Sequence, residues 1–80
     1  MDDGSGIKAR IEKYIRMFYD NRAKVTTEGV GKKTVELSDM YASDAKSFLE
    51  KKDYYTAFAS IEYAHGLLDA VIAIRDENVH

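Results

Sequence analysis

The stretch YYTAFASIEYAHGLLDAVIAIR, residues 54–75, decides the fold because it stays largely apolar over about six helical turns. One set of its side chains recurs at three- and four-residue steps, the period of a helix with one buried face. This stripe consists of Tyr54, Ala57, Phe58, Ile61, Ala64, Leu68 and Ile72. Asp53 precedes it and is a good N-cap, because its charge favours a helix N-terminus. The stretch therefore predicts a helix over residues 54–75 that faces a core.

The same stretch carries a second apolar stripe on roughly the opposite side, beside a line of small residues. The two together comprise Ala59, Tyr63, Gly66, Leu67, Ala70, Ala73 and Ile74. Glycine inside a helix costs roughly 1 kcal/mol relative to alanine, so Gly66 indicates close approach of another backbone. In one explanation a second copy packs this helix against its own, and these seven residues form a homodimer interface. In the other, the first helix of the same chain covers part of the stripe.

Two further helices are predicted upstream. Residues 35–51 follow Thr34, an N-cap candidate, and their apolar face is Leu37, Tyr41, Ala45, Phe48 and Leu49. Residues 7–24 repeat apolar side chains at helical spacing after Ser5, another N-cap candidate, and residues 25–33 read as a loop. The short joint after residue 51 makes the second and third helices antiparallel neighbours. We predict one all-α domain over residues 1–80, an antiparallel three-helix bundle with frayed ends at 1–6 and 76–80.

Composition narrows the class of protein. The chain has 80 residues, no cysteine and no proline, so disulfides and thiolate metal sites are excluded. Nothing resembles a signal peptide, and no uninterrupted apolar run approaches the roughly 20 residues of a membrane span. We therefore expect a cytoplasmic protein without a membrane partner. The net charge of −2 hides an asymmetry, with eight Lys or Arg against five acids in residues 1–33 and four against nine afterwards.

The string FLEKKDYYTAFASIEYAHGLLDA, residues 48–70, with LSDMYASDAKS upstream, resembles a small archaeal family, domain of unknown function 357. The resemblance covers about residues 36–71 and implies a three-helix bundle of the albumin-binding-domain kind. No activity, cofactor or catalytic residue is established for that family, so the resemblance implies none here. The matching positions are Phe48, Asp53, Tyr54, Ala57, Phe58, Tyr63, Ala64, His65, Gly66, Leu68, Asp69 and Ala70. Members often have glycine, which suits the left-handed turn ending a helix, where this chain has Lys52.

Glu62, His65 and Asp69 lie on one flank of the predicted third helix. Glu-x-x-His is half of the di-iron carboxylate motif, which needs a second copy and further carboxylates, and the chain's other histidine is His80. One interpretation is a metal site shared by two subunits. The other is a boundary histidine hydrogen-bonded to Asp69 or to a neighbouring helix. We predict the second, and with it no metal, no cofactor and no catalytic residue.

The basic N-terminal part of the chain, residues 1–33, contains a candidate nucleic-acid surface. It consists of Lys13, Arg16, Lys24, Lys32 and Lys33. Glu12 and Asp20 interrupt it, so a solvated helix face explains these residues better than RNA contact. The sequence thus predicts a non-catalytic association module that is homodimeric through its third helix, with an unidentified protein as a further candidate partner. The alternatives are an RNA-associated accessory protein that uses these basic residues, and a metal-binding helical protein that uses Glu62, His65 and Asp69.

Overall fold

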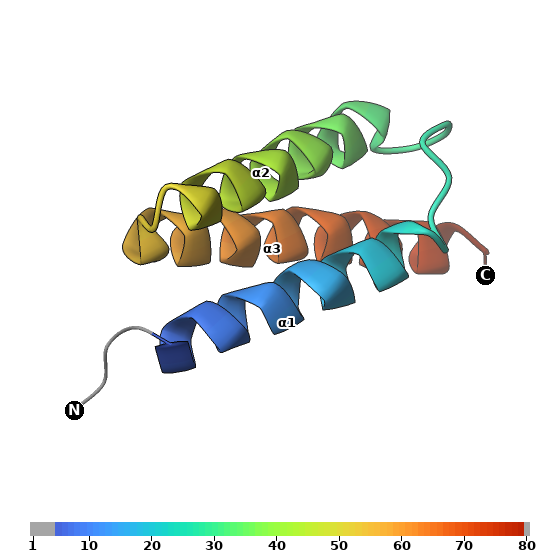
Figure 1. The fold of residues 1–80 in the computed structure, drawn as a ribbon. Helices are drawn as coiled ribbons and strands as arrows, with labels where there is room; N and C mark the ends of the chain where they lie inside the picture. Colours follow the sequence, from blue (N-terminus) through green and yellow to red (C-terminus); the bar gives the residue numbers. More distant parts are fainter. Residues whose placement is uncertain (1–4, 80) are drawn as a thin grey trace.

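The computed structural model describes residues 5–79, in which two loops, 23–31 and 51–53, join three helices. They are α1 (Ser5–Arg22), α2 (Lys32–Glu50) and α3 (Tyr54–Val79), and no strand occurs within residues 5–79. In Figure 1, α2 and α3 form an antiparallel pair, while α1 runs beside α3 and in the same direction. The predicted all-α three-helix bundle is confirmed.

The helix boundaries depart from the predicted ones by up to four residues. α1 begins and ends two residues before the predicted 7–24, α2 extends from 32 to 50 instead of 35 to 51, and α3 begins at Tyr54 as predicted. α3 continues past Arg75 to Val79, because no glycine or proline follows to stop it. Residues 5–6 and 76–79 of the expected frayed ends are therefore helical. Residues 1–4 and 80 lie outside the described residues.

Glycine, and not a hydroxyl side chain, begins α2, so the N-cap prediction at Thr34 is wrong. The cap is Gly31, which has a left-handed backbone (φ 82°) and makes no side-chain cap bond. A Cβ at this position would lie 3.1 Å from Cγ2 of Val71 on α3. A side chain would both strain the backbone and crowd α3, and glycine avoids both costs. The Ser5 side chain, the N-cap candidate for α1, lies outside the described part of the chain.

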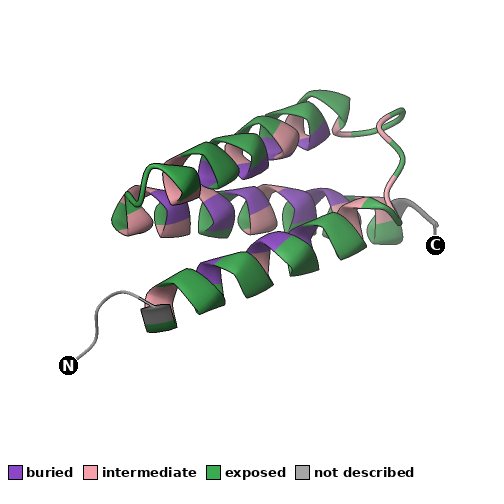
Figure 2. Ribbon diagram, in the orientation of Figure 1, coloured by how far each residue is buried: buried purple, intermediate pink, exposed green. Residues whose placement is uncertain are grey.

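The core is centred on α3, which packs against both other helices. Its buried residues are Ala57, Ile61, Ala64, Leu68 and Val71, those of α1 are Ile11, Ile15 and Phe18, and those of α2 are Val35, Ser38, Ala42 and Ala45. In Figure 2, the buried positions of α2 and α3 lie on the sides that the two helices turn toward each other. On the predicted apolar face of α2, Ala45 is buried and Tyr41, Phe48 and Leu49 pack against the core, whereas Leu37 is exposed.

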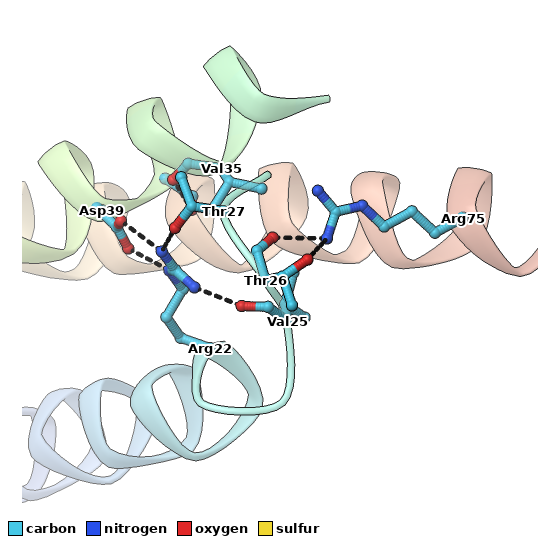
Figure 3. Close-up of polar contacts among 8 residues, drawn as sticks. Arg22, Val25, Thr26, Thr27, Val35, Asp39 and Arg75 are labelled. Atoms are coloured by element: carbon cyan, nitrogen blue, oxygen red, sulfur yellow. Dashed lines mark hydrogen bonds and ion pairs between the residues drawn. The ribbon is translucent and has the colours of Figure 1, made fainter. Parts of the chain in front are cut away.

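Two arginines fasten the loop between α1 and α2 (Figure 3). Arg22 donates to both carboxylate oxygens of Asp39 on α2, at 2.7 and 3.1 Å, and to the Val25 carbonyl at 2.6 Å. The hydrogen bond to Asp39 raises the pKa of the Arg22 guanidinium above its ordinary value. Arg75 on α3 donates to the loop carbonyls of Thr26, Glu28 and Val30 at 2.6 to 3.0 Å. The loop is thereby tied to α2 and to α3.

The joint between α2 and α3 has the hydrogen bonds of a Schellman C-cap. Lys52 adopts a left-handed backbone with φ 64°. Its N–H donates to the Leu49 carbonyl at 3.0 Å, and the Asp53 N–H donates to the Phe48 carbonyl at 2.9 Å. Asp53 then caps α3 as predicted, since its Oδ1 accepts the Thr56 N–H at 3.2 Å. Lys52 therefore occupies a position where glycine costs less.

We expect Lys52→Gly to raise the free energy of unfolding by about 0.5–1 kcal/mol, because it removes the steric cost of a side chain in the left-handed region. The change should appear as a melting temperature higher by a few degrees in thermal denaturation followed by circular dichroism. Lys51→Gly is the matched control, because Lys51 has a right-handed backbone (φ −78°) and should lose stability. An unchanged or lower melting temperature for Lys52→Gly would contradict this account.

Candidate functional site on the outer face of α3

One side of α3 is apolar and exposed. We call this surface the outer face; it consists of Tyr55, Ala59, Tyr63, Gly66, Ala70, Ala73 and Ile74. Its large side chains are 87 % (Tyr55), 52 % (Tyr63) and 44 % (Ile74) exposed. Six of its seven members belong to the interface predicted from the sequence, and the remaining predicted residue, Leu67, is half-buried beside it.

Gly66 lies at the centre of the outer face and contacts nothing across from it. A Cβ built on Gly66 would meet no atom of another part of the structure within 4 Å. The expectation that α1 covers part of this stripe is therefore wrong for the residues around Gly66. α1 instead contacts the flank of α3 that carries Phe58 and His65, where the Tyr14 ring centroid lies 5.9 Å from that of Phe58.

The outer face continues toward α2 through an aromatic pair. The rings of Tyr41 on α2 and Tyr63 on α3 meet edge to face with centroids 4.6 Å apart. Leu37, exposed on the same helix as Tyr41, follows at a spacing of four residues. The sequence placed Leu37 and Tyr41 on the apolar face of the second helix and gave Tyr55 no role. Tyr41 packs against the core as predicted, whereas Leu37 is exposed, because helical periodicity marks an apolar face without showing where its cover ends.

His65 is a structural residue between α3 and α1. Its Nε2 lies 2.8 Å from the backbone carbonyl oxygen of Tyr14, and because a carbonyl only accepts, Nε2 carries the proton and donates it. The imidazole also meets the rings of Tyr14 and Phe18 edge to face, with centroids 6.3 and 5.8 Å away. Of the two predicted partners of His65, the neighbouring helix is the one observed.

The chemistry around His65 does not converge on a metal position. Glu62 and Asp69 are both exposed, whereas the Nε2 of His65 points at the Tyr14 carbonyl. Among the described residues, no group of three or more histidine, aspartate or glutamate side chains is placed to hold a metal ion. The described residues of one chain therefore do not form a complete metal site. The absence of metal and cofactor in solution stays a prediction.

The candidate nucleic-acid residues Lys13, Arg16, Lys24, Lys32 and Lys33 are all exposed. Lys32 is engaged by Glu28, with its Nζ 3.3 Å from the carboxylate. Lys24 borders an open hollow that Thr26, Ile72 and Asp76 also line, together with the loop-bound Arg75. RNA contact by these residues stays a prediction, and no contact in the structure favours it.

A family model matches residues 13–75, which is more than three quarters of the chain, and its description reads "Protein of unknown function (DUF357)". The chain belongs to this family. The match confirms the resemblance seen over residues 36–71 and extends it into α1, while the archaeal origin and cytoplasmic location stay predictions. No curated protein and no solved structure matches the chain. Membership in DUF357 therefore shows which family the chain belongs to, and it assigns no activity to the outer face.

Within the described residues, α3 is long and apolar enough to cross a membrane by length and composition alone, over Tyr54–Glu77. Only 28 % of its most apolar window is buried inside the structure. The core helix of a globular protein passes the same test of length and composition. Among the described residues, α3 also has more that are buried than the other helices have, five against four in α2 and three in α1.

We expect purified protein to contain no stoichiometric zinc or iron, even after expression in metal-supplemented medium, because the Nε2 of His65 is used by the Tyr14 carbonyl. Elemental analysis by mass spectrometry measures this directly. As a second readout, His65→Ala should lower the free energy of unfolding by about 1–2 kcal/mol, because it removes the partly buried hydrogen bond to the Tyr14 carbonyl. Glu62→Ala is the control and should leave stability nearly unchanged. One tightly bound metal per subunit or per dimer would overturn the structural role.

Proposed function

We propose that this DUF357 protein is a non-catalytic association module that docks a helix on the outer face of α3. The observation that carries the proposal is the open position of Gly66, where a Cβ would meet nothing within 4 Å. Around it, Tyr55, Tyr63 and Ile74 keep about half or more of their surface in solvent. Contiguous apolar surfaces of this kind on small soluble proteins mark interaction sites.

The shape of the outer face suits a helix. Ala59, Gly66 and Ala73 follow one another at seven-residue spacing, so their Cα atoms line up along one side of α3. Small side chains in such a row let a second helix approach closely, as they do where helices cross in tight pairs. Tyr63 and Ile74 border the row and would pack over the flank of the docked helix. The seven residues of the outer face are small, aromatic or aliphatic, which suits packing against a partner.

Gly66 has a cost in the isolated chain that nothing within the chain offsets. Glycine in a helix interior is about 1 kcal/mol less favourable than alanine. Gly31, in contrast, is required by its φ of 82° and by the nearby Val71. A helix docked closely over position 66 would offset this cost, because a larger side chain there would hold its backbone away.

We expect Gly66→Ala to raise the free energy of unfolding by about 1 kcal/mol, because it improves helix propensity at a position with free space. Chemical denaturation at low protein concentration measures the change. The matched control is Gly31→Ala, which should destabilise the protein because of its left-handed backbone. If Gly66→Ala also destabilises, the bundle itself requires glycine there, and the docking surface loses its main support.

A second copy of the chain is the occupant predicted from the sequence, and its test is the oligomeric state. Light scattering behind a sizing column should be run at tens of micromolar, about the concentration that populates a specific weak dimer. If a dimer forms, Gly66→Leu and Ile74→Asp should dissociate it, while Met17→Asp on the exposed side of α1 should not. A dimer that resists both outer-face variants would contradict the proposed surface. A monomer would exclude the second copy and leave a helix of another protein as the occupant.

A further inference from the structure

On α3 itself, the charged groups beside the outer face that have no partner among the described residues are carboxylates. Lys24, from the loop between α1 and α2, lines the same hollow as Asp76. α3 contains four acids, Glu62, Asp69, Asp76 and Glu77, and all four are exposed. Its one arginine, Arg75, is not available to a partner. The Nε and both terminal nitrogens of that guanidinium donate to the carbonyls of Val30, Thr26 and Glu28. A helix that docks here therefore meets carboxylates and no free cation from α3.

Three of these acids form a row that runs beside the small residues. Glu62, Asp69 and Asp76 each follow a member of the Ala59, Gly66 and Ala73 row by three residues, so the two rows are parallel. The acidic row lies on the flank toward α1, because His65 beyond it contacts Tyr14. On the flank toward α2, Leu67 and Ile74 continue the apolar surface. The docking surface therefore has one acidic edge and one apolar edge.

The ion pairs found among the described residues are Arg22–Asp39 and Lys32–Glu28. The acidic row is part of neither. Charges along the edges of a helix pair determine partner choice and orientation more than they determine stability. An unpaired row of one sign next to an apolar centre therefore indicates the complementary sign on the partner.

A second copy does not supply that sign. In a two-fold pair with antiparallel α3 helices, equal edges meet, so the acidic row faces the acidic row of the other copy. In a parallel two-fold pair, the acidic row faces the partner's apolar edge at Leu67 and Ile74. Neither arrangement brings a cation to Glu62 or Asp69 from the opposing α3. Charge thus disfavours the homodimer that shape alone allows.

We infer that the outer face of α3 binds an amphipathic helix of another protein, with a small or apolar centre and Lys or Arg at seven-residue spacing along one edge. This inference rests on the proposed docking function and specifies its partner. Lysine and arginine suit the edge because their long stems cover apolar surface while the charged end reaches the carboxylates. A helix of 26 residues is about 39 Å long, which gives room for three such pairs along α3.

The experiment uses two synthetic peptides of about 20 residues with the same alanine and leucine centre. One carries lysine along one edge, and the other carries glutamate at the same positions. Each fluorescently labelled peptide is titrated with the full chain, and binding is followed by fluorescence anisotropy. We expect binding of the lysine peptide at about 50 mM salt, a loss of about tenfold or more in affinity at about 500 mM salt, and no measurable binding of the glutamate peptide.

Protein variants test whether the acidic row itself, and not the net charge of the protein, selects the peptide. Glu62→Lys combined with Asp69→Lys should reverse the preference, so that the glutamate peptide binds and the lysine peptide does not. The matched control, Glu12→Lys combined with Asp20→Lys, makes the same change in net charge on the exposed side of α1 and should keep the preference. Gly66→Leu should weaken the lysine peptide about tenfold at both salt concentrations, with helix content unchanged by circular dichroism.

The outcomes test the inferred charge of the partner separately from the docking surface itself. If both peptides bind alike and Gly66→Leu abolishes both, the docking surface is right and the basic partner is wrong. The inference about the partner is also wrong if the control pair of variants reverses the preference, or if the protein dimerises tightly through Gly66 at low salt. If neither peptide binds, no dimer forms and Gly66→Ala destabilises the fold, then the proposed function fails together with the inference.

Discussion

Alanine side chains set the distance between α2 and α3, and the rest of the structure follows from it. Ala42 and Ala45 on α2 and Ala57 and Ala64 on α3 are fully buried. Methyl-sized side chains allow two helix backbones to come close, and this leaves the larger residues to pack at the borders of the contact. The antiparallel pair uses one side of α3 for this contact. α1 then covers the adjoining flank with Ile11, Ile15 and Phe18, so the bundle has its core without using the third side of α3.

The contrast between two glycines shows where the fold ends and the docking surface begins. Gly31 adopts a backbone conformation that few other residues tolerate and lies against Val71, so the bundle itself explains it. Gly66 has ordinary helical geometry and free space above it. The bundle therefore explains Gly31, whereas it does not explain Gly66, and the proposed docking of a helix is our explanation for the second glycine.

Arginine use in this small protein also bears on binding. Arg22 and Arg75 donate hydrogen bonds that hold the loop between α1 and α2 in place. Arg75 is the one lysine or arginine of α3, and its donors are used by the loop. No cation of α3 is therefore free beside the acids that border the outer face. One guanidinium group therefore links the position of the loop to the charge beside the proposed docking surface.

The resemblance to DUF357 suggested the left-handed position at Lys52, whereas the sequence predicted the three helical segments, the Asp53 cap and most of the outer face. These features depend on neighbours within about four residues, or on the period with which apolar residues recur, and both can be read along the chain. Periodicity could not show that Leu37 is exposed while Val35 and Ala42 are buried, because all three residues are apolar. It also could not place Gly31 against Val71, the Tyr14 carbonyl against His65, or Arg75 against the loop. Those contacts join residues about 40 to 50 positions apart. Only the tertiary structure decided them, because they depend on how closely the helices pack and on which flank α1 covers.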